Sequence, residues 1–566
     1  MPLSKKTAPV LILFLAVFFV YLRTANPVFH ANDSPETAAC SYTLGIQHPP
    51  GYPLPTLTGK IFTFIPAGNP GFRTSLQAAF FGAMTIVLFF LGSMIMLRRK
   101  NDGYGPVLAS LAAALALAFS FTLWSEALAA KGGIYTLNNF FLVLIILLLF
   151  SWEASGEKRF FYLASFSYGL SLANHWESMG VVTPALIIYV IATVRNPLSK
   201  AKLDLKMFFT AVGFGLLGPL LYLYLVIRSA SDAYLNWGRP ENLSALIEVV
   251  TRGQYADLEK ARGIEVVMRQ VKKFISLFTF EFTAWGAALS TAGAYSLVKR
   301  AKKNVFLLFS ALIVTVFLAL SFYFNLKEEM LWIMDVFMIP VYAAAAYFAA
   351  AGILYIADRA KKFKLPVLAL FFALPVYLFA ANYGRADQSR YFFGYDLGKN
   401  IIRCIELPAI AMLEGDFNVM PMMYFKYVEK SALFCPLTTL FLYKDWGVKN
   451  TRVECPEVKM ELPPGAGFGA RIAGVVAQNY AERAIYTSVF REAFGEFFPQ
   501  GSAMLSPNGV VMKFGADKKA AVKEADINFK KITYRNLFTK GASINSTTKL
   551  CICLLYTSPS PRDRTR

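Results

Sequence analysis

The sequence predicts a polytopic α-helical membrane protein of about eleven transmembrane helices, with a soluble α/β domain at its C-terminal end. The 566 residues are 56% hydrophobic and include 51 Phe, whereas soluble domains are about 45–50% apolar. The excess lies in blocks of roughly 17–25 residues, the length that crosses a bilayer core. From about residue 383 shorter alternating segments replace these blocks. We therefore divide the chain into a membrane domain, residues 1–382, and a soluble domain, residues 383–550.

The first apolar run, residues 10–22, follows Lys5 and Lys6. It is short enough for a signal peptide, but no small-x-small cleavage site follows it, so we expect a retained helix. About ten further apolar stretches have the composition of transmembrane helices. They lie at 77–97, 105–123, 134–151, 159–173, 177–194, 207–227, 275–297, 304–324, 331–356 and 365–382.

Basic residues in the short loops predict the orientation of these helices. With the N-terminus in the cytoplasm every inside loop is basic, as the positive-inside rule requires. The basic loops also explain the net charge of +21, so we expect no nucleic-acid partner. The membrane is the plasma or inner membrane if the protein is bacterial, and the endoplasmic reticulum if it is eukaryotic. The inside loops are RRK (98–100), EKR (157–159), RNPLSKAKLDLK (195–206), KRAKKN (299–304) and DRAKKFK (358–364).

This orientation puts the segments 26–76 and 228–274 and the soluble domain on the non-cytoplasmic side. In the soluble domain LGKNIIRCIEL and NVMPMMYFKYVEK are typical of helices, while AIAMLEG and LTTLFLY are typical of strands. This alternation predicts a parallel sheet. Cys435 and Cys455 can pair if their compartment is oxidising, and Cys404 is then left over.

The tail of the chain, residues 551–566, differs from everything before it. Its sequence, CICLLYTSPSPRDRTR, is rich in Ser, Pro and Arg and has no apolar periodicity. It resembles translated read-through sequence, and we exclude it from the fold as a non-native tail.

Acids and a histidine gather in the first outer segment. Asp33 and Glu36 lie in DSPE, and His48 begins HPPGYP. DSPE is also the pattern of a helix start, with Asp33 or Ser34 as the cap, Pro35 in the first turn and Glu36 beside the helix dipole. HPPGYP predicts a rigid extended turn, because proline lacks an N–H donor and disfavours helix in the residue before it. The residues alone leave capping and site roles open.

Polar groups also interrupt the later apolar runs. Asp335 lies about one turn inside LWIMDVFMIP; at a helix centre a carboxylate costs roughly 2.5–3.5 kcal/mol on insertion scales, and less at the rim. It should face the bundle or a wet cavity, or form an ion pair with Arg228 or Lys327. Asn174 and His175, between the fifth and sixth predicted spans, either line a cavity or satisfy a helix end.

Several segments together resemble a known family. The first outer segment has D-S-x-E followed by A-A, then YTLGIxHPPGYPL and an arginine in FRTSLQAAFFGA. The combination resembles membrane proteins catalogued as domain of unknown function 2723, which include animal O-mannosyltransferases that modify proteins. They belong to the GT-C class of glycosyltransferases. The further matching segments are IYTLNNFF (134–141), GLSLANHWES (169–178), YLNWGRPENL (234–243) and VTRGQY (250–255).

The resemblance implies an inverting glycosyltransferase with a GT-C-like fold. In this class an acid of the first outer loop is the expected base, which matches Asp33 and Glu36, with Asp33 preferred. The donor would be mannose or another hexose on a polyprenyl or dolichyl phosphate, and the acceptor a Ser or Thr hydroxyl of a protein. The chain departs from the family at Pro35, where Gly is usual, and at the turn that begins with Lys131, where an acid is often found. No family role is carried over to that turn.

The leaving lipid phosphate needs positive charge and hydrogen-bond donors rather than an acid. The candidates are Arg228, Arg239, His48 and Lys131. Trp237 can stack on a sugar ring or anchor the membrane interface. No DxD motif accompanies the first-loop acids and no nucleotide fingerprint is present. We therefore expect no metal ion and no cofactor beyond the lipid-linked donor.

Other functions remain open. A polysaccharide polymerase or ligase would use the same type of donor and differ only in its acceptor. A transporter or lipid flippase would show internal repeats and polar groups at the membrane midplane, whereas here no repeat relates the halves and the acids lie at the outer rim. This difference favours an enzyme. A structural scaffold would leave Asp33 and Asp335 freely replaceable.

Overall fold

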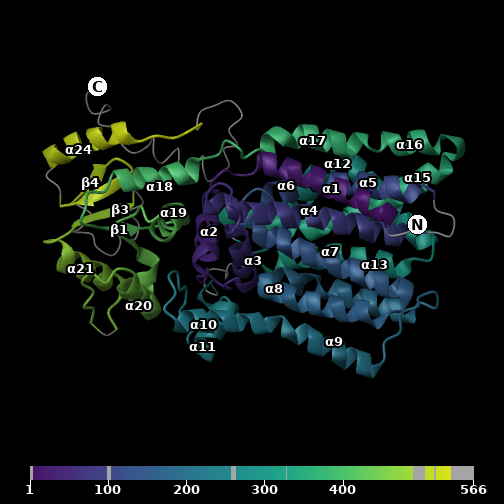
Figure 1. The fold of residues 1–566 in the computed structure, drawn as a ribbon, viewed down its shortest axis with the longest axis horizontal. Helices are drawn as coiled ribbons and strands as arrows, with labels where there is room; N and C mark the ends of the chain where they lie inside the picture. The colour runs from purple at the N-terminus through teal and green to yellow at the C-terminus, as the bar shows by residue number, and fades with distance from the viewer. Residues whose placement is uncertain are drawn as a thin grey trace.

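The computed structural model describes residues 4–98, 103–255, 263–324, 326, 328–463, 465–488, 504–515 and 518–536. They form a helical part and an α/β part, which lie end to end along the long axis of the molecule (Figure 1). Most helices of the helical part run along this axis. The tail that the sequence marked as non-native, residues 551–566, lies outside the described residues.

Among the described residues, seven segments are long and apolar enough to cross a membrane, by length and composition. Together with α12 (Ile264–Lys299) and the shorter apolar helices α1 (Ser4–Thr24) and α5 (Gly105–Ala118), they contain or overlap every predicted apolar stretch. The number of membrane crossings stays a prediction. The seven segments are α4 (Pro70–Leu97), α7 (Gly132–Ser155), α8 (Lys158–Arg195), α9 to α10 (Leu205–Ala230), α13 to η3 (Lys303–Tyr323), η4 to α15 (Met330–Arg359) and η5 to α17 (Lys361–Ala386).

Four of these segments are built from several helices each. Short helices also lie between the segments, at the end of the bundle that meets the α/β part. The components are α9 (Leu205–Leu217), η1 (Pro219–Tyr222), α10 (Leu223–Ala230), α13 (Lys303–Leu318), η3 (Ala319–Tyr323), η4 (Glu328–Ile333), α14 (Met334–Phe337), α15 (Ile339–Arg359), η5 (Lys361–Phe363), α16 (Lys364–Leu370) and α17 (Ala373–Ala386). The short helices are α2 (Ser34–Thr43), α3 (Pro53–Thr63), α6 (Phe121–Glu126), α11 (Leu243–Val250) and η2 (Gly253–Tyr255).

The chain reverses direction within α8. His175 has non-helical backbone angles, φ −152° and ψ 86°. The Tyr168 hydroxyl lies 2.6 Å from Thr183 Oγ1, so the halves on either side pack together. Lys158, at the start of α8, pairs at 3.1 Å with Asp204, which lies beyond its end. The two spans that the sequence predicts here are therefore the two arms of a helical hairpin, with His175 at the tip.

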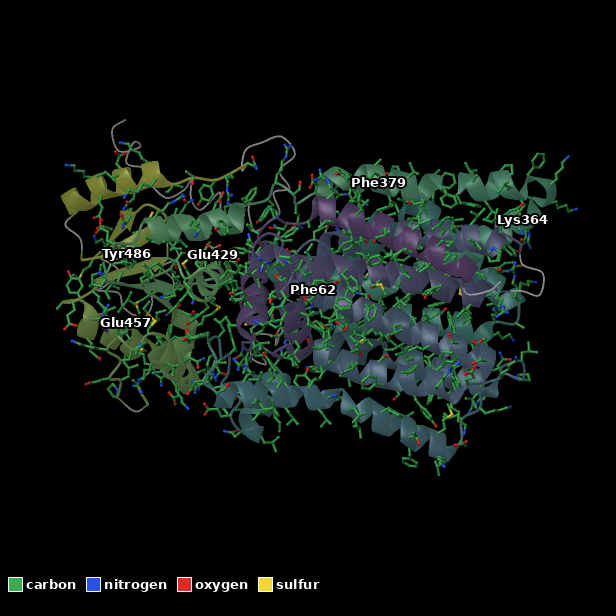
Figure 2. The ribbon with its side chains drawn as sticks, in the orientation of Figure 1. Phe62, Lys364, Phe379, Glu429, Glu457 and Tyr486 are labelled. Carbon is green, nitrogen blue, oxygen red and sulfur yellow. A yellow bond between two sulfur atoms is a disulfide. The ribbon has the colours of Figure 1, made fainter. Side chains whose placement is uncertain are left out.

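Small residues allow the central helices to approach closely. A β-carbon added at Gly293 of α12 would lie 1.7 Å from the Phe348 carbonyl oxygen of α15, and one at Gly352 would lie 2.0 Å from the Leu289 carbonyl. Without a hydrophobic drive between helices in lipid, such close packing is a main source of association. In Figure 2 carbon dominates the side chains of the bundle, where Phe379 is labelled, whereas oxygen and nitrogen are frequent over the α/β part.

The α/β part contains a five-stranded sheet in the order β2–β1–β3–β5–β4. β1 (Ala409–Leu413) is parallel to β2 (Cys435–Thr438) and β3 (Ala484–Ser488), whereas β5 (Val511–Phe514) is antiparallel to β3 and to β4 (Leu505–Asn508). The prediction of a parallel sheet is wrong at this edge, because a tight hairpin at Gly509, with φ 68°, joins β4 and β5. The helices of this part are α18 (Phe393–Arg403), α19 (Asp416–Tyr427), η6 (Thr439–Tyr443), α20 (Asp445–Glu454), α21 (Phe468–Asn479) and α24 (Lys518–Lys531).

Most predicted elements of this part have the expected type. AIAMLEG contains β1, LGKNIIRCIEL overlaps α18, and NVMPMMYFKYVEK overlaps α19. LTTLFLY is the exception, because β2 ends at Thr438 and the rest of the segment forms the 3₁₀ helix η6. Five of its residues, TLFLY, are therefore helical rather than extended, and η6 leads directly toward α20.

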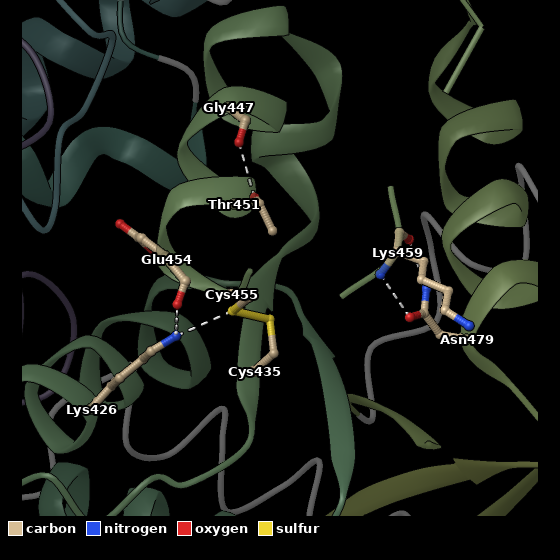
Figure 3. The surroundings of a disulfide bond; sticks show 8 residues. All are labelled: Lys426, Cys435, Gly447, Thr451, Glu454, Cys455, Lys459 and Asn479. Atoms are coloured by element: carbon tan, nitrogen blue, oxygen red, sulfur yellow. Dashed lines mark hydrogen bonds between the residues drawn. A yellow bond between two sulfur atoms is a disulfide. The ribbon is translucent and has the colours of Figure 1, made fainter. Parts of the chain in front are cut away.

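A disulfide ties α20 to the sheet. Cys435 and Cys455 are bonded, with Cα atoms 5.7 Å apart, while Cys404 is a buried thiol outside the pair. Lys426 of α19 donates to the Glu454 carbonyl at 2.8 Å and lies 3.2 Å from Cys455 Sγ (Figure 3). The disulfide thus holds the end of α20 against β2, and the Lys426 side chain holds it against α19.

Replacing both Cys435 and Cys455 by Ser is expected to destabilise the α/β part by roughly 3 kcal/mol. The disulfide spans a sequence separation of 20 residues, and closing a loop of that length restricts the unfolded chain. Thermal unfolding followed by intrinsic fluorescence should show a lower midpoint for the double variant. Dithiothreitol should lower the wild-type midpoint and leave that of the variant unchanged. Equal midpoints for the oxidised wild type and the variant would contradict the prediction.

The α/β part docks on the outer segments of the helical part. Phe29, just before α2, packs edge-on against Tyr424 of α19 with ring centroids 4.9 Å apart. The Tyr424 hydroxyl accepts a hydrogen bond from the Gly71 N–H at 3.4 Å. On α20, the Asn450 side chain donates to the Asn236 carbonyl at 2.5 Å. These contacts hold α19 and α20 over the segments 26–76 and 228–274, which the sequence predicts on the non-cytoplasmic side.

Candidate active site

Asp33 stands directly before α2, but it does not cap the helix. Its backbone is in the helical region, φ −72° and ψ −12°, and its side chain makes no capping hydrogen bond. The carboxylate turns instead to the ammonium group of Lys131, with Oδ2 and Nζ 3.2 Å apart. Lys131 precedes α7, so this ion pair joins the starts of two helices that are far apart in the sequence. The Asp33 side chain therefore does not cap α2, and its role in a site stays a prediction.

Three further contacts extend this ion pair. Lys131 Nζ lies 3.2 Å from His48 Nε2. On the other side of the ring, His48 Nδ1 lies 2.5 Å from Glu36 Oε2, and the His48 backbone N–H donates to Glu36 Oε1 at 2.7 Å. We call Asp33, Glu36, His48 and Lys131 the rim cluster. A continuous chain of polar contacts runs through it from one carboxylate to the other.

The chain of contacts assigns a protonation pattern. A carboxylate only accepts hydrogen bonds, so the short contact with Glu36 puts a proton on His48 Nδ1. In a neutral imidazole Nε2 then carries a lone pair, which faces a donor, the ammonium group of Lys131. Glu36 is only 1% exposed, whereas Asp33 is 25% exposed. Glu36 therefore orients His48 from within, and Asp33 is the carboxylate that a substrate can reach.

The charged groups of the rim cluster shift the pKa values of Asp33 and Lys131. Burial by itself would raise the pKa of Asp33, but the positive charge of Lys131 and the nearby His48 outweigh it and lower this pKa below its ordinary value. Burial opposes the charge of Lys131, yet Tyr52 and Asp33 outweigh it and raise the pKa of the ammonium group. At neutral pH the pair is accordingly fully ionised.

The turn HPPGYP places aromatic rings beside the cluster. Tyr52, at the end of this turn, has a positive φ of 44°, and its ring lies 4.5 Å from Lys131 Nζ. Its ring centroid is 5.6 Å from that of His48 and 5.9 Å from that of His175. His175 is thus linked to the cluster by the Tyr52 ring, which contacts both His175 and His48. Asn174 donates to the Ile134 carbonyl at 2.9 Å and so ties the hairpin tip to the start of α7.

Arg228 and Arg239 point away from the cluster. Arg228 donates through Nε to the Leu44 carbonyl at 2.8 Å, beyond the end of α2. Arg239 is buried and pairs with Asp232 and Glu241. Neither guanidinium contacts the rim cluster, and among the four cations weighed for the lipid phosphate Lys131 and His48 lie in it. Of the candidates named from the sequence, only Lys131 and His48 therefore lie beside Asp33.

Trp237 joins the rim cluster to the α/β part. Its ring lies edge-on to His48, with centroids 6.0 Å apart, and perpendicular to Phe441 at 5.0 Å. Its indole N–H donates to Gln254 Oε1 at 3.3 Å. The ring is therefore held by the second outer segment next to the accessible end of the cluster.

Asp335 has a different partner from those expected. Its Oδ1 lies 3.0 Å from Lys273 Nζ of α12. The proposed pair with Arg228 is wrong, because that side chain is turned to α2, and Lys327 lies outside the described residues. A cation on the neighbouring helix explains the carboxylate as part of the packing between α12 and the α14 region.

Asp416, the first residue of α19, was not predicted from the sequence. Protein surrounds it on most sides although its side chain is exposed to solvent. This partial loss of hydration, and after it the negative charge of Asp33, raise the pKa of Asp416 to about 6. Its position directly after a parallel strand, β1, and Gly415 was an available signal, since binding residues often follow the carboxyl ends of such strands. Its nearness to the rim cluster depends on docking and has no local signal.

Comparisons with known proteins show what the sequence is similar to. Residues 33–199, which include the whole rim cluster, match the family described as Protein O-mannosyl-transferase TMEM260 N-terminal domain. The chain is 25% identical over 442 residues to Protein O-mannosyl-transferase TMEM260 of Mus musculus, covering 74% of this chain and 60% of that protein. For Protein O-mannosyl-transferase tmem260 of Dictyostelium discoideum the values are 24% over 478 residues, 76% and 56%. The chain thus spans less than two thirds of either relative.

Solved structures share the fold over nearly the whole chain. ArnT from Cupriavidus metallidurans bound to undecaprenyl phosphate has a TM-score of 0.55 and 10% identity, covering 90% of this chain and 98% of that one. Its apo state has a TM-score of 0.53, 11% identity and the same coverage. At such identity these likenesses show the fold alone. Together these comparisons show that the chain is similar in sequence to protein O-mannosyl-transferases and shares the fold of the membrane protein ArnT.

Proposed function

We propose that the protein is an inverting glycosyltransferase that moves mannose or another hexose from a polyprenyl- or dolichyl-phosphate carrier to a Ser or Thr hydroxyl of a protein. The observation that carries this proposal is the rim cluster, in which an accessible carboxylate, Asp33, lies 3.2 Å from the ammonium group of Lys131. One group can take a proton while the other binds a phosphate. The names of the relatives and the lipid phosphate bound to ArnT support this choice of substrates.

The transfer is a single displacement. The acceptor oxygen attacks the anomeric carbon on the face opposite the phosphate, and a new C–O bond forms as the bond to the phosphate breaks. The leaving lipid phosphate takes the electron pair, and the acceptor proton passes to Asp33. Lys131 stabilises the negative charge that grows on the phosphate. Because the bound phosphate also adds negative charge beside the ion pair, donor binding makes this carboxylate a better base.

The buried half of the cluster keeps Lys131 in place. His48 accepts from the ammonium group through Nε2 while Glu36 holds the ring through Nδ1. These contacts restrict the position of the Lys131 ammonium group, so its charge is already in place before the donor binds. We assign no metal ion to the reaction.

We further propose that the N-terminus is cytoplasmic and that the rim cluster and the α/β part lie on the non-cytoplasmic side. The basic loops support this orientation. One of them contains Lys364, which lies at the end of the bundle opposite Tyr486 and Glu457 of the α/β part (Figure 2). The disulfide Cys435–Cys455 supports it too, since disulfides persist in oxidising compartments.

The test is sugar transfer by the purified protein in nanodiscs. Radiolabelled polyprenyl-phosphate mannose is supplied with Ser/Thr peptides, in the presence of EDTA. We expect the label on the peptide hydroxyl. Transfer only to an added oligosaccharide would assign the protein to the glycan polymerases or ligases. Movement of the labelled lipid across vesicles without transfer to any acceptor would replace the proposal by a transporter.

A further inference from the structure

The segment that carries Trp237 has a strained backbone. Leu235 has a φ of 58° and Arg239 a φ of 41°, in the left-handed region that residues with a side chain rarely adopt. Such residues persist only where the surrounding structure fixes them, and they gather at binding and active sites. The segment 235–239 therefore depends on contacts from outside itself, and these contacts determine where the Trp237 ring lies.

One set of contacts comes from the first outer segment. The Ile46 N–H donates to the Leu235 carbonyl at 2.7 Å, and the Trp237 N–H donates to the Ile46 carbonyl at 3.4 Å. Ile46 lies two residues before His48. The backbone beside Trp237 is thus paired with the backbone that leads to the rim cluster, which brings the indole ring to 6.0 Å from the His48 ring.

The other set of contacts comes from α20 of the α/β part. Asn450 is 2% exposed; its Nδ2 donates to the Asn236 carbonyl at 2.5 Å and its Oδ1 accepts from Arg239 at 3.1 Å. These partners stand on the two sides of Trp237 in the chain. A carbonyl only accepts and a guanidinium only donates, so an amide, which has both kinds of group, suits the position.

The place of Trp237 decides which part of a substrate it can meet. Phe441 and Trp446 of the α/β part pack against the ring, with centroids 5.0 and 6.1 Å away, yet the residue is only half-buried. Lys131, the proposed phosphate ligand, contacts His48 on the ring next to Trp237. A hexose is bonded directly to that phosphate, so the sugar of a bound donor lies within reach of the exposed part of the indole.

We propose that Asn450 is a positioning residue, which holds the segment 235–239 so that the Trp237 ring packs on the hexose of the lipid-linked donor. Asn450 acts through Trp237 and does not itself touch the substrate. The inference rests on the proposed function and deepens it, because it gives the α/β part a share in recognising the sugar. For Trp237 it selects the sugar-stacking role over that of a membrane anchor.

Two lipids separate contacts with the sugar from contacts with the phosphate. The affinities of the purified protein in nanodiscs for polyprenyl-phosphate mannose and for polyprenyl phosphate are measured without acceptor. We expect Asn450→Ala to weaken binding of the mannose-bearing lipid at least about fivefold, the size of an aromatic packing contact. Binding of the bare lipid phosphate should stay within twofold, because Lys131 is unchanged. Asn450→Asp keeps the shape but cannot donate to Asn236, and it should show the same selective loss.

A double variant shows whether Asn450 acts through Trp237. If it does, Trp237→Ala combined with Asn450→Ala binds polyprenyl-phosphate mannose no more weakly than Trp237→Ala alone. Additive losses overturn the inference. Asn479→Ala is the matched control, because Asn479 is a 1% exposed amide of α21 that donates to the Lys459 and Val475 carbonyls, each at 2.8 Å. It should lower the thermal midpoint as Asn450→Ala does and leave both affinities unchanged.

The remaining outcomes distinguish this inference from the proposed function. A selective loss in Asn450→Ala supports the inference even if the wild type transfers no sugar, in which case the proposed chemistry alone fails. Equal affinity of wild type and Asn450→Ala for polyprenyl-phosphate mannose overturns the inference while transfer stands. A wild type that binds both lipids equally, or equal losses in Asn450→Ala and Asn479→Ala, overturn it as well. If Asn450→Ala does not fold, Asn450→Asp decides between the same outcomes.

Discussion

Replacing Asp33 by Asn is expected to lower kcat for mannose transfer from polyprenyl phosphate by at least about a hundredfold, with the fold intact. General-base catalysis is typically worth about 10²–10⁴-fold, and Asp33 is the accessible carboxylate of the rim cluster. The amide keeps the shape of the side chain and can still contact Lys131, but it cannot take the acceptor proton. Donor KM should change little, because Lys131 and its charge remain. Initial rates with saturating donor and peptide measure the effect.

Two control variants separate a loss of the base from a general effect of removing a carboxylate. Asp526→Asn removes a half-exposed carboxylate of α24 that pairs with Lys530, and it should leave kcat within twofold. Glu36→Gln should lower the thermal midpoint as well as kcat, since Glu36 is buried and accepts two hydrogen bonds from His48. Wild-type kcat in Asp33→Asn would remove Asp33 from the chemistry. The base would then have to be sought among the remaining carboxylates near the cluster, Glu36 and Asp416.

Periodicity and residue type were sufficient to predict much of the fold. The apolar blocks mark their own helices, and the polar pair Asn174 and His175 marks the tip of the α8 hairpin because two apolar arms flank it. The strand β1 was also predicted, and the pair Cys435–Cys455 was expected on the condition of an oxidising compartment. The antiparallel edge of the sheet was not, because the strands around Gly509 are short and their pairing partner β3 is distant in the chain.

The candidate site was predictable only where its residues share one segment. Asp33, Glu36 and His48 lie within the first outer segment, so their proximity follows from one helix and one rigid turn. Lys131 lies just before α7, and its contact with Asp33 depends on where that helix starts relative to α2. Arg228, by contrast, is positively charged, but its side chain is directed to the end of α2 and not to the rim cluster. Residue type can nominate a phosphate-binding cation, but only tertiary packing decides which one faces the carboxylate.

Lys131 provides the second large effect. Lys131→Gln is expected to lower kcat/KM for the lipid donor by about 10²–10³-fold, the loss typical when a group that stabilises developing negative charge is removed. The variant also takes away the charge that holds the pKa of Asp33 low, so the acid limb of the pH–rate profile should move to higher pH. Initial rates against donor concentration, repeated from pH 5 to 8, measure both changes.

Two further variants show whether the position or only the charge of Lys131 matters. Lys131→Arg keeps the charge, but a planar guanidinium is not equivalent to a compact ammonium group, so we expect partial recovery of donor kcat/KM. Lys60→Gln removes a cation of α3 that donates to the Tyr42 carbonyl at 2.5 Å and should leave donor kcat/KM within twofold. Loss of donor kinetics in Lys60→Gln with retention in Lys131→Gln would place the phosphate at α3 instead. If Lys131→Gln alone shows the loss together with the shifted acid limb, a single ammonium group both binds the leaving phosphate and sets the basicity of Asp33, which is what its position between that carboxylate and His48 requires.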